Sequence, residues 1–259
     1  MLLLDAYLPT GSDGKPGSFG GSDGGVPAIV VVHGGAWSGG RRSEAPDWNH
    51  WLTEQGFAVF DVDYRIQPQP NWQTATGDVR AAVSAIRRDA ARYGIDPNRI
   101  ALLGRSAGGH LALLAAYAAA PLEDREDSRV QAVVAFYAPT DLIWGYDHSA
   151  NQRVIDGPGT LRRFIGGDPR AAEEAYVAAS PVTHVQLGTP PTLLFHGGRD
   201  QFVRLEHMER LGKRLLNAGV PHEMVSLPYA QHGFDVLFDG WGAQLARPLV
   251  LRFLRARLI

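Results

Sequence analysis

Residues 102–110 read LLGRSAGGH, and the rest of the sequence is best understood from this stretch. It begins in an apolar run, which favours a buried strand, and residues 111–120 after it are almost wholly Ala and Leu, which favours a buried helix. Ser106 therefore stands at a sharp turn between a strand and a helix. We expect Gly104 and Gly108 beside it because strand and helix approach too closely there for side chains. Such a turn exposes the serine hydroxyl at the end of a sheet.

Apolar strand patterns alternate with helical patterns along the whole chain. The predicted strands are residues 2–8, 27–32, 57–63, 100–103, 130–136, 192–195 and 224–227, and the predicted helices are 78–93, 111–120, 205–219 and 244–258. This alternation predicts an α/β fold with a mostly parallel central sheet and helices on both faces. In such a sheet, ligands bind at the carboxyl ends of the strands.

No long linker divides the chain, so residues 1–259 are expected to form a single domain. Residues 140–188 are rich in Gly, Pro, Trp and Tyr and are only weakly periodic. They predict short helices that lie over the sheet edge as a small cap insertion. Residues 10–25 predict a flexible loop, in which Pro16 stands where a phosphate-binding loop would need Ser or Thr.

Composition argues against several classes of function. The formal net charge is −2, so nothing favours nucleic acid or an acidic membrane as a partner. The absence of cysteine removes disulfides and thiolate chemistry. No apolar run approaches the roughly 20 residues that span a bilayer, and residues 1–9 do not resemble a secretion signal. We therefore expect a cytoplasmic protein without a cofactor. The sequence is compatible with a homodimer.

Three more polar signals follow predicted strands. HGGAW at residues 33–37 comes before Ser106. Asp200 follows it in the segment HGGRDQFV, and His232 comes last in the segment AQHGF. The separations leave room for a helix and a strand between Asp200 and His232, so all of these signals can meet at one edge of the sheet.

Ser106, Asp200 and His232 occur along the chain in the order that is found in α/β-hydrolases. The chain resembles this superfamily over essentially its whole length. The motifs H-G-G-x-W and G-x-S-A-G-G are similar to those of small esterases. These include carboxylesterases, acetyl-xylan and feruloyl esterases, arylformamidases, and relatives of hormone-sensitive lipase. Arg105 departs from the last group, which usually has aspartate at this position, and from the arylformamidases, which have histidine there.

The resemblance implies a serine hydrolase. Ser106 would be the nucleophile, His232 the base that takes its proton, and Asp200 the acid that orients the imidazole. The negative charge on the attacked carbonyl oxygen requires preorganised donors. The expected oxyanion-hole donors are the backbone N–H groups of Gly34, Gly35 and Ala107.

The remaining polar candidates have structural interpretations. We expect His33 to brace the oxyanion loop, His110 to pack in its helix and His196 to support the loop of the acid. No metal site is expected, because the other histidines show no metal-ligand spacing: His50, His148, His184, His207 and His222. Asp61, Asp63 and Asp141 are expected to be loop or capping residues.

Six aromatic residues flank the catalytic loops or lie in the predicted cap, and they indicate an apolar acyl or aryl pocket. They are Trp37, Trp144, Tyr146, Phe164, Phe202 and Phe234. With little chain before the first strand to roof the site, we expect an open cleft that takes short acyl groups and fairly bulky alcohols.

The favoured function is therefore a carboxylesterase on a small-molecule ester of a short acyl or aryl acid. The nearest alternative is an arylformamidase that cleaves N-formylkynurenine with the same three residues. An acetyl-xylan or feruloyl esterase would require export, and a peptidase or a lid-bearing lipase is less favoured. A non-catalytic binding protein of the same fold is the alternative outside this class, although such proteins commonly lose one of the three residues.

Overall fold

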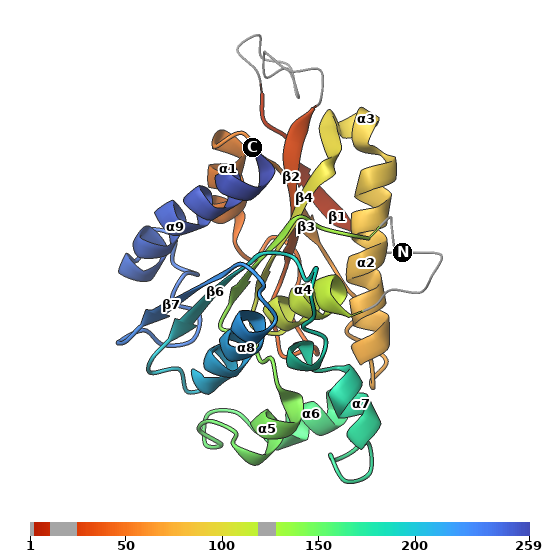
Figure 1. Cartoon of the computed structure of the whole chain (residues 1–259), viewed down its shortest axis with the longest axis vertical. Coiled ribbons are helices and arrows are strands. Elements are labelled where there is room, and N and C mark those ends of the chain that lie inside the picture. Colours follow the sequence, from red (N-terminus) through yellow and green to blue (C-terminus); the bar gives the residue numbers. More distant parts are fainter. Residues whose placement is uncertain (1–2, 11–24, 119–127) are drawn as a thin grey trace.

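The computed structural model describes residues 3–10, 25–118 and 128–259 (Figure 1). Within these residues, seven strands form one sheet in the order β1-β3-β2-β4-β5-β6-β7. The strands are β1 (Leu4–Tyr7), β2 (Val26–Val32), β3 (Ala58–Val62), β4 (Ile95–Arg105), β5 (Ala132–Phe136), β6 (Thr192–Gly197) and β7 (His222–Leu227). Only β1 is antiparallel to its neighbour; the other pairings are parallel. The expected α/β architecture is confirmed.

Helices cover both faces of this sheet (Figure 1). They are α1 (Pro46–Glu54), α2 (Trp72–Arg88), α3 (Ala90–Tyr93), α4 (Ala107–Tyr117), α8 (Glu206–Asn217) and α9 (Trp241–Leu258). Side chains alternate across β2, so Val30 packs on one face with α2, α4 and α8, whereas Ile29 packs on the other with α1 and α9. Because both faces are buried, β2 is a continuous apolar run rather than an alternating one.

Several element boundaries differ from the sequence expectations. The helix expected at residues 78–93 begins earlier, at Trp72. The sequence prediction missed its first turns because polar residues and Gly77 interrupt the apolar pattern there. It also ends earlier, and the short α3 follows and stops at Gly94, whose φ is +65°. Helix α1 has no counterpart among the predicted elements. The predicted loop at 10–25 falls almost wholly outside the described residues, as does the end of the helix predicted at 111–120.

Residues 140–188, here called the cap segment, connect β5 to β6. They contain α5 (Leu142–Asp147), α6 (Gly157–Ile165), α7 (Glu173–Ala178) and a 3₁₀ turn at Pro181–Thr183. Figure 1 shows α5, α6 and α7 grouped together at one end of the molecule. This segment therefore covers the sheet edge at which the catalytic signals of the sequence converge.

In the part of the chain that the structure describes, none of the helices has the length and apolar character required to cross a membrane.

Candidate active site

Ser106 occupies the turn between β4 and α4 in a strained backbone conformation, with φ 52° and ψ −119°. Its N–H donates a hydrogen bond to the carbonyl oxygen of Phe136 at 2.9 Å, which fixes the turn to the neighbouring strand. The glycines beside it are required by close approach. A Cβ on Gly104 would lie 2.3 Å from the carbonyl oxygen of Gly108, and a Cβ on Gly108 would lie 2.2 Å from that of Val32.

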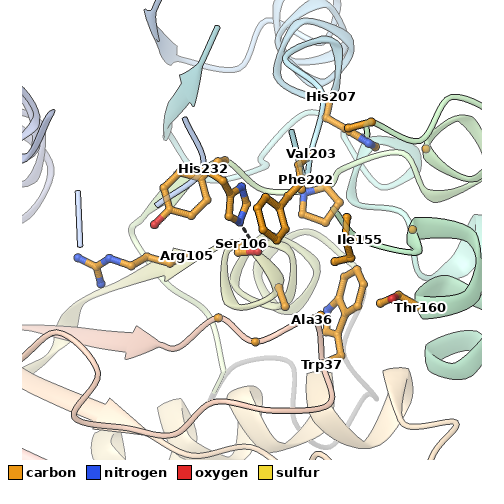
Figure 2. Close-up of a pocket in the computed structure, with 18 of the residues that line it drawn as sticks. Ala36, Trp37, Arg105, Ser106, Ile155, Thr160, Phe202, Val203, His207 and His232 are labelled. Atoms are coloured by element: carbon orange, nitrogen blue, oxygen red, sulfur yellow. Dashed lines mark hydrogen bonds between the residues drawn. The ribbon is translucent and has the colours of Figure 1, made fainter. Parts of the chain in front are cut away.

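The structure brings Ser106, His232 and Asp200 into one hydrogen-bonded chain (Figure 2 shows the first two). Nε2 of His232 lies 2.9 Å from Oγ of Ser106, and Nδ1 lies 2.7 Å from Oδ2 of Asp200. The buried carboxylate also accepts the N–H groups of Phe202 and Val203 through Oδ1, at 2.8 and 3.0 Å. A carboxylate only accepts, so Nδ1 carries the proton and Nε2 is free to accept the proton of the serine.

Three rings, of which Tyr137 and His196 are buried, hold His232 and the loop of Asp200 in place. Tyr137 packs against the imidazole of His232 at 4.4 Å between ring centroids, and Phe202 stacks on it at 5.0 Å. His196 lies 2.9 Å from the carbonyl oxygen of Val203 through Nε2. Burial lowers the pKa of His196, so its neutral ring donates to that carbonyl. His196 thus supports the loop of the acid, as expected.

His33 braces the loop at the end of β2. Its Nδ1–H donates to the carbonyl oxygen of Gly34 at 2.7 Å, and the hydroxyl of Tyr64 donates to the same oxygen at 3.1 Å. The two rings stack at 4.3 Å. In a trans peptide the N–H points opposite to the carbonyl oxygen, so holding the oxygen of Gly34 directs the N–H of Gly35 away from His33 and Tyr64.

The residues expected to supply the oxyanion donors lie beside Ser106. A Cβ on Gly34 would lie 3.5 Å from Cβ of Ser106, so this loop is adjacent to the serine. Gly35 has a φ of +109°, and a Cβ there would lie 2.2 Å from the carbonyl oxygen of Gly39. Ala107 is the first residue of α4, where the helix leaves its N–H groups without an intrahelical acceptor.

Asp235 is a buried residue that the sequence-based site did not include. It links Arg105, which precedes Ser106, to Tyr137, which packs on His232. Its carboxylate accepts Nε–H of Arg105 at 2.6 Å and the hydroxyl of Tyr137 at 2.6 Å, and its carbonyl oxygen accepts Nε1–H of Trp48 at 2.8 Å. Burial alone would lower the pKa of Arg105, but the charge and hydrogen bond of Asp235, with smaller contributions from Tyr137 and Asp61, together outweigh burial and raise it. Asp235 thus connects the residue before Ser106 to the ring that packs on His232.

We expect Asp235→Asn to lower the free energy of unfolding by about 3–5 kcal/mol, because it leaves the buried guanidinium of Arg105 without a counter-charge. Denaturant unfolding followed by circular dichroism measures this. The matched control is Glu223→Gln, which breaks the exposed ion pair with Arg252 and should cost less than about 1 kcal/mol. Equal losses in the two variants would contradict a special role for the buried pair.

Ser106 opens onto a cleft of about 530 Å³ (Figure 2). Its walls are mostly apolar, and they come from the loop after β2, the loop after β6, the loop that carries His232, and the cap segment. Of the six aromatic residues predicted to bind substrate, Trp37 and Phe202 line this cleft. The arrangement can therefore hold an apolar group next to the hydroxyl of Ser106.

The prediction is wrong for the other four aromatic residues, which do not line the cleft. Phe164 is fully buried and stacks behind Trp37 at 4.2 Å between ring centroids. Phe234 packs at the opposite sheet face, against Phe136 and Tyr137.

Trp144 and Tyr146 belong to the outer packing of the cap segment. Trp144 stacks on His148 at 4.8 Å and lies beneath the guanidinium of Arg210. Tyr146 meets Tyr176 edge-on at 6.0 Å. Both residues lie on the short helix α5, and these contacts determine which face of the helix points to the cleft. The sequence pattern gives no information on these contacts.

Four further polar candidates take structural roles. His110 accepts Nε1–H of Trp37 at 3.1 Å and donates to the carbonyl oxygen of Ala179 at 2.7 Å, and burial lowers its pKa to about 4. Asp141 caps α5, as expected, by accepting the N–H of Trp144. Asp61 and Asp63 accept backbone N–H groups of the loop before α1, from Ser43 and Arg42 respectively.

The fold and these motifs place the chain among proteins with the α/β-hydrolase fold. Residues 19–215 match the model of the BD-FAE family, and the chain belongs to that family. It is 34% identical over 252 residues to the esterase LipC of Mycobacterium tuberculosis, with 92% of this chain and 58% of that protein covered. It is 32% identical over 229 residues to a probable carboxylic ester hydrolase, LipM, of the same organism, with 85% and 52% covered. The chain thus spans little more than half the length of these curated relatives.

A solved structure with the same fold is the native thermophilic esterase Est2 of Thermogutta terrifontis. Its TM-score is 0.77 at 28% identity, with 98% of this chain and 87% of that chain covered. The same esterase has been solved with butyrate bound and phosphonylated by sarin.

Proposed function

We propose that this protein is a serine carboxylesterase that hydrolyses esters of short acyl or aryl acids. The observation that carries the proposal is the hydrogen-bonded chain from Asp200 through His232 to Ser106 at the floor of an apolar cleft. An isolated serine hydroxyl is a weak nucleophile, and this chain supplies the base that activates it.

The geometry supports a two-stage reaction. His232 takes the proton of Ser106 as the oxygen attacks the ester carbonyl, and it returns that proton to the departing alcohol. Asp200 stabilises the imidazolium that forms in between and keeps Nδ1 protonated. The product of this stage is an acyl-serine. Water then attacks the acyl carbon with His232 again as the base, which releases the acid and restores the serine.

The oxyanion hole assigned to this reaction is formed by backbone N–H groups of Gly34, Gly35 and Ala107. Their positions are preorganised, because His33 and Tyr64 hold the loop and α4 holds Ala107. Losing one such donor typically removes about 3 kcal/mol of transition-state stabilisation.

The comparisons support the same activity. The curated relatives named above are esterases or carboxylic ester hydrolases, and the structural relative holds butyrate in one form. Phosphonylation of that esterase by sarin agrees with an activated nucleophile of the kind proposed for Ser106.

The main alternative is an arylformamidase, because hydrolysis of N-formylkynurenine would use the same residues. The deciding measurement is kcat/KM for N-formyl-L-kynurenine relative to that for p-nitrophenyl acetate, with Ser106→Ala as the blank. We expect a ratio far below one. A ratio near or above one would make the formamidase the primary activity.

The size of the acyl group is tested with the same assay. The cap segment bounds the cleft, so p-nitrophenyl acetate and butyrate should give a higher kcat/KM than p-nitrophenyl palmitate. A steady rise from two to sixteen carbons would show that the cleft opens into a long acyl channel and would contradict this assignment.

A further inference from the structure

His207, on the first turn of α8, is a buried polar residue that the proposed reaction does not use. Its side chain lines the same cleft as Ser106, although only 5% of the residue is exposed. Figure 2 shows it across the cavity from Ser106, beyond the ring of Phe202. Most of its neighbours in this part of the cleft are apolar, such as Leu142 and Leu161. A polar group in such a place requires an explanation.

The backbone fixes the protonation state of this ring. Nδ1 accepts hydrogen bonds from the N–H groups of Thr140 at 3.1 Å and Asp141 at 3.3 Å. A nitrogen that accepts two N–H groups cannot carry a proton itself, so the proton of the neutral ring is on Nε2. Burial lowers the pKa of His207 to about 3, and the nearby cationic side chains add to this effect. The ring therefore stays neutral near pH 7, with Nε2–H as a donor.

Nε2–H has no hydrogen-bond acceptor among the described residues, and it is not sealed inside the protein either. Trp144 packs at right angles to the ring at 5.1 Å between centroids and restrains its orientation. The other neighbour is Gly145, where a Cβ would lie 2.8 Å from both Nε2 and Cε1 of His207. Gly145 has an ordinary helical backbone, and its lack of a side chain allows α5 to approach this edge of the ring closely.

The two ends of the cleft can be assigned to the two halves of an ester. His232 must reach the oxygen of the leaving alcohol, so the alcohol lies on the side lined by Gly233 and Val236, which follow it in sequence. The acyl group then extends the other way, past Trp37 and into the part of the cleft covered by the cap segment. That is the part that contains His207.

We propose that Nε2–H of His207 is a specificity-determining donor that binds an uncharged oxygen acceptor, a ketone, ether or hydroxyl oxygen, on the acyl group of the substrate. This inference rests on the proposed esterase function and refines it. An acyl group that carries such an oxygen satisfies the donor, whereas a plain alkyl chain removes it from water without compensation.

The test compares esters that differ only by one oxygen. We define the oxygen preference as kcat/KM for the oxo ester divided by kcat/KM for the alkyl ester. It is measured with p-nitrophenyl 4-oxopentanoate against pentanoate, and with 5-oxohexanoate against hexanoate. The variant is His207→Asn, because Oδ1 of Asn can take the place of Nδ1 and keep the bonds to Thr140 and Asp141, while its NH₂ group takes the place of Cδ2 and no donor stands at the position of Nε2.

We expect the oxygen preference of the wild type to fall about three- to tenfold in His207→Asn for at least one pair of esters. Gly145→Ala should lower it in the same way, because its methyl group would lie 2.8 Å from Nε2 and displace the donor of His207 from its place in the cleft, and it carries the test if His207→Asn does not fold. His222→Asn, the same substitution on β7 and outside the cleft, should leave the preference unchanged. Thermal unfolding of each variant verifies that it is folded.

An oxygen preference that is equal in the wild type, His207→Asn and Gly145→Ala for both pairs would overturn the inference and leave the esterase function intact. Failure of the wild type to hydrolyse any of the four esters, with no difference from Ser106→Ala, would overturn the proposed function as well.

Discussion

Ser106→Ala should lower kcat/KM for p-nitrophenyl butyrate by about 10⁵-fold or more, because it removes the atom that forms the acyl intermediate. The residual rate should be the rate of direct attack by water on the ester, assisted only by the oxyanion hole and by binding in the cleft. Steady-state kinetics measure the loss. Intact-protein mass spectrometry measures the covalent step directly: an organophosphonate should add one adduct to the wild type and none to Ser106→Ala.

Ser226 provides the matched control. It lies exposed on β7, outside the cleft, so Ser226→Ala should keep both the activity and the adduct. Substantial turnover by Ser106→Ala would instead show that Ser106 is not the nucleophile, and an adduct at another serine would identify the alternative.

Asp200→Asn should lower kcat by about 10⁴-fold while the protein stays folded. The amide fits the same space between Phe202 and His232. Its C=O must accept the N–H groups of Phe202 and Val203, so its NH₂ group faces Nδ1 and donates to it. The ring proton then lies on Nε2, which can no longer act as the base. The loss should appear in kcat more than in KM, because the cleft that binds the ester is unchanged. Thermal unfolding of the variant distinguishes lost chemistry from lost structure.

Asp141→Asn is the matched substitution. Its side chain caps α5 and pairs with Arg210, and it does not line the cleft. Activity should change by no more than about threefold, which is the size of effect expected from a surface ion pair. Loss of activity in Asp141→Asn with a normal rate in Asp200→Asn would mean that the acid has been assigned to the wrong carboxylate.

The convergence of Ser106, Asp200 and His232 was predictable because each follows a strand of a parallel sheet. Topology places all such positions at one edge, whatever their separation in sequence. The glycines around Ser106 were predictable for a similar reason, since a tight turn between a strand and a helix excludes a Cβ there. The local sequence pattern and the order of the strands therefore suffice to predict these residues of the site.

Asp235 was not predictable in the same way. It lies close to His232 in sequence, but its partners Arg105 and Tyr137 come from the ends of β4 and β5. A side-chain pairing between distant segments leaves no periodicity to detect. The six aromatic residues show the same difficulty, because Trp37 and Phe164 stack on each other and only one of two stacked rings can face the cleft.

His207 did leave a signal that points to burial. It stands at helical spacing before Leu211 and Leu215, both of which lie in the apolar face of α8. A histidine on such a face is buried with its polar atoms, so each nitrogen needs a partner. The sequence does not show that Nδ1 meets the backbone at Thr140 and that Nε2 meets the cleft, since both contacts depend on where the cap segment begins.

The cap segment supplies its share of the cleft wall from one uninterrupted stretch of chain, and none of Ser106, Asp200 and His232 belongs to it. Recombination or insertion between β5 and β6 can therefore exchange this part of the cleft wall in a single genetic event. The strained turn at Ser106 is held by β2, β4 and β5 and would survive that exchange. The cleft wall can thus evolve new substrate preferences while the residues proposed for the chemistry are preserved. Grafted cap segments offer the same route to the protein engineer.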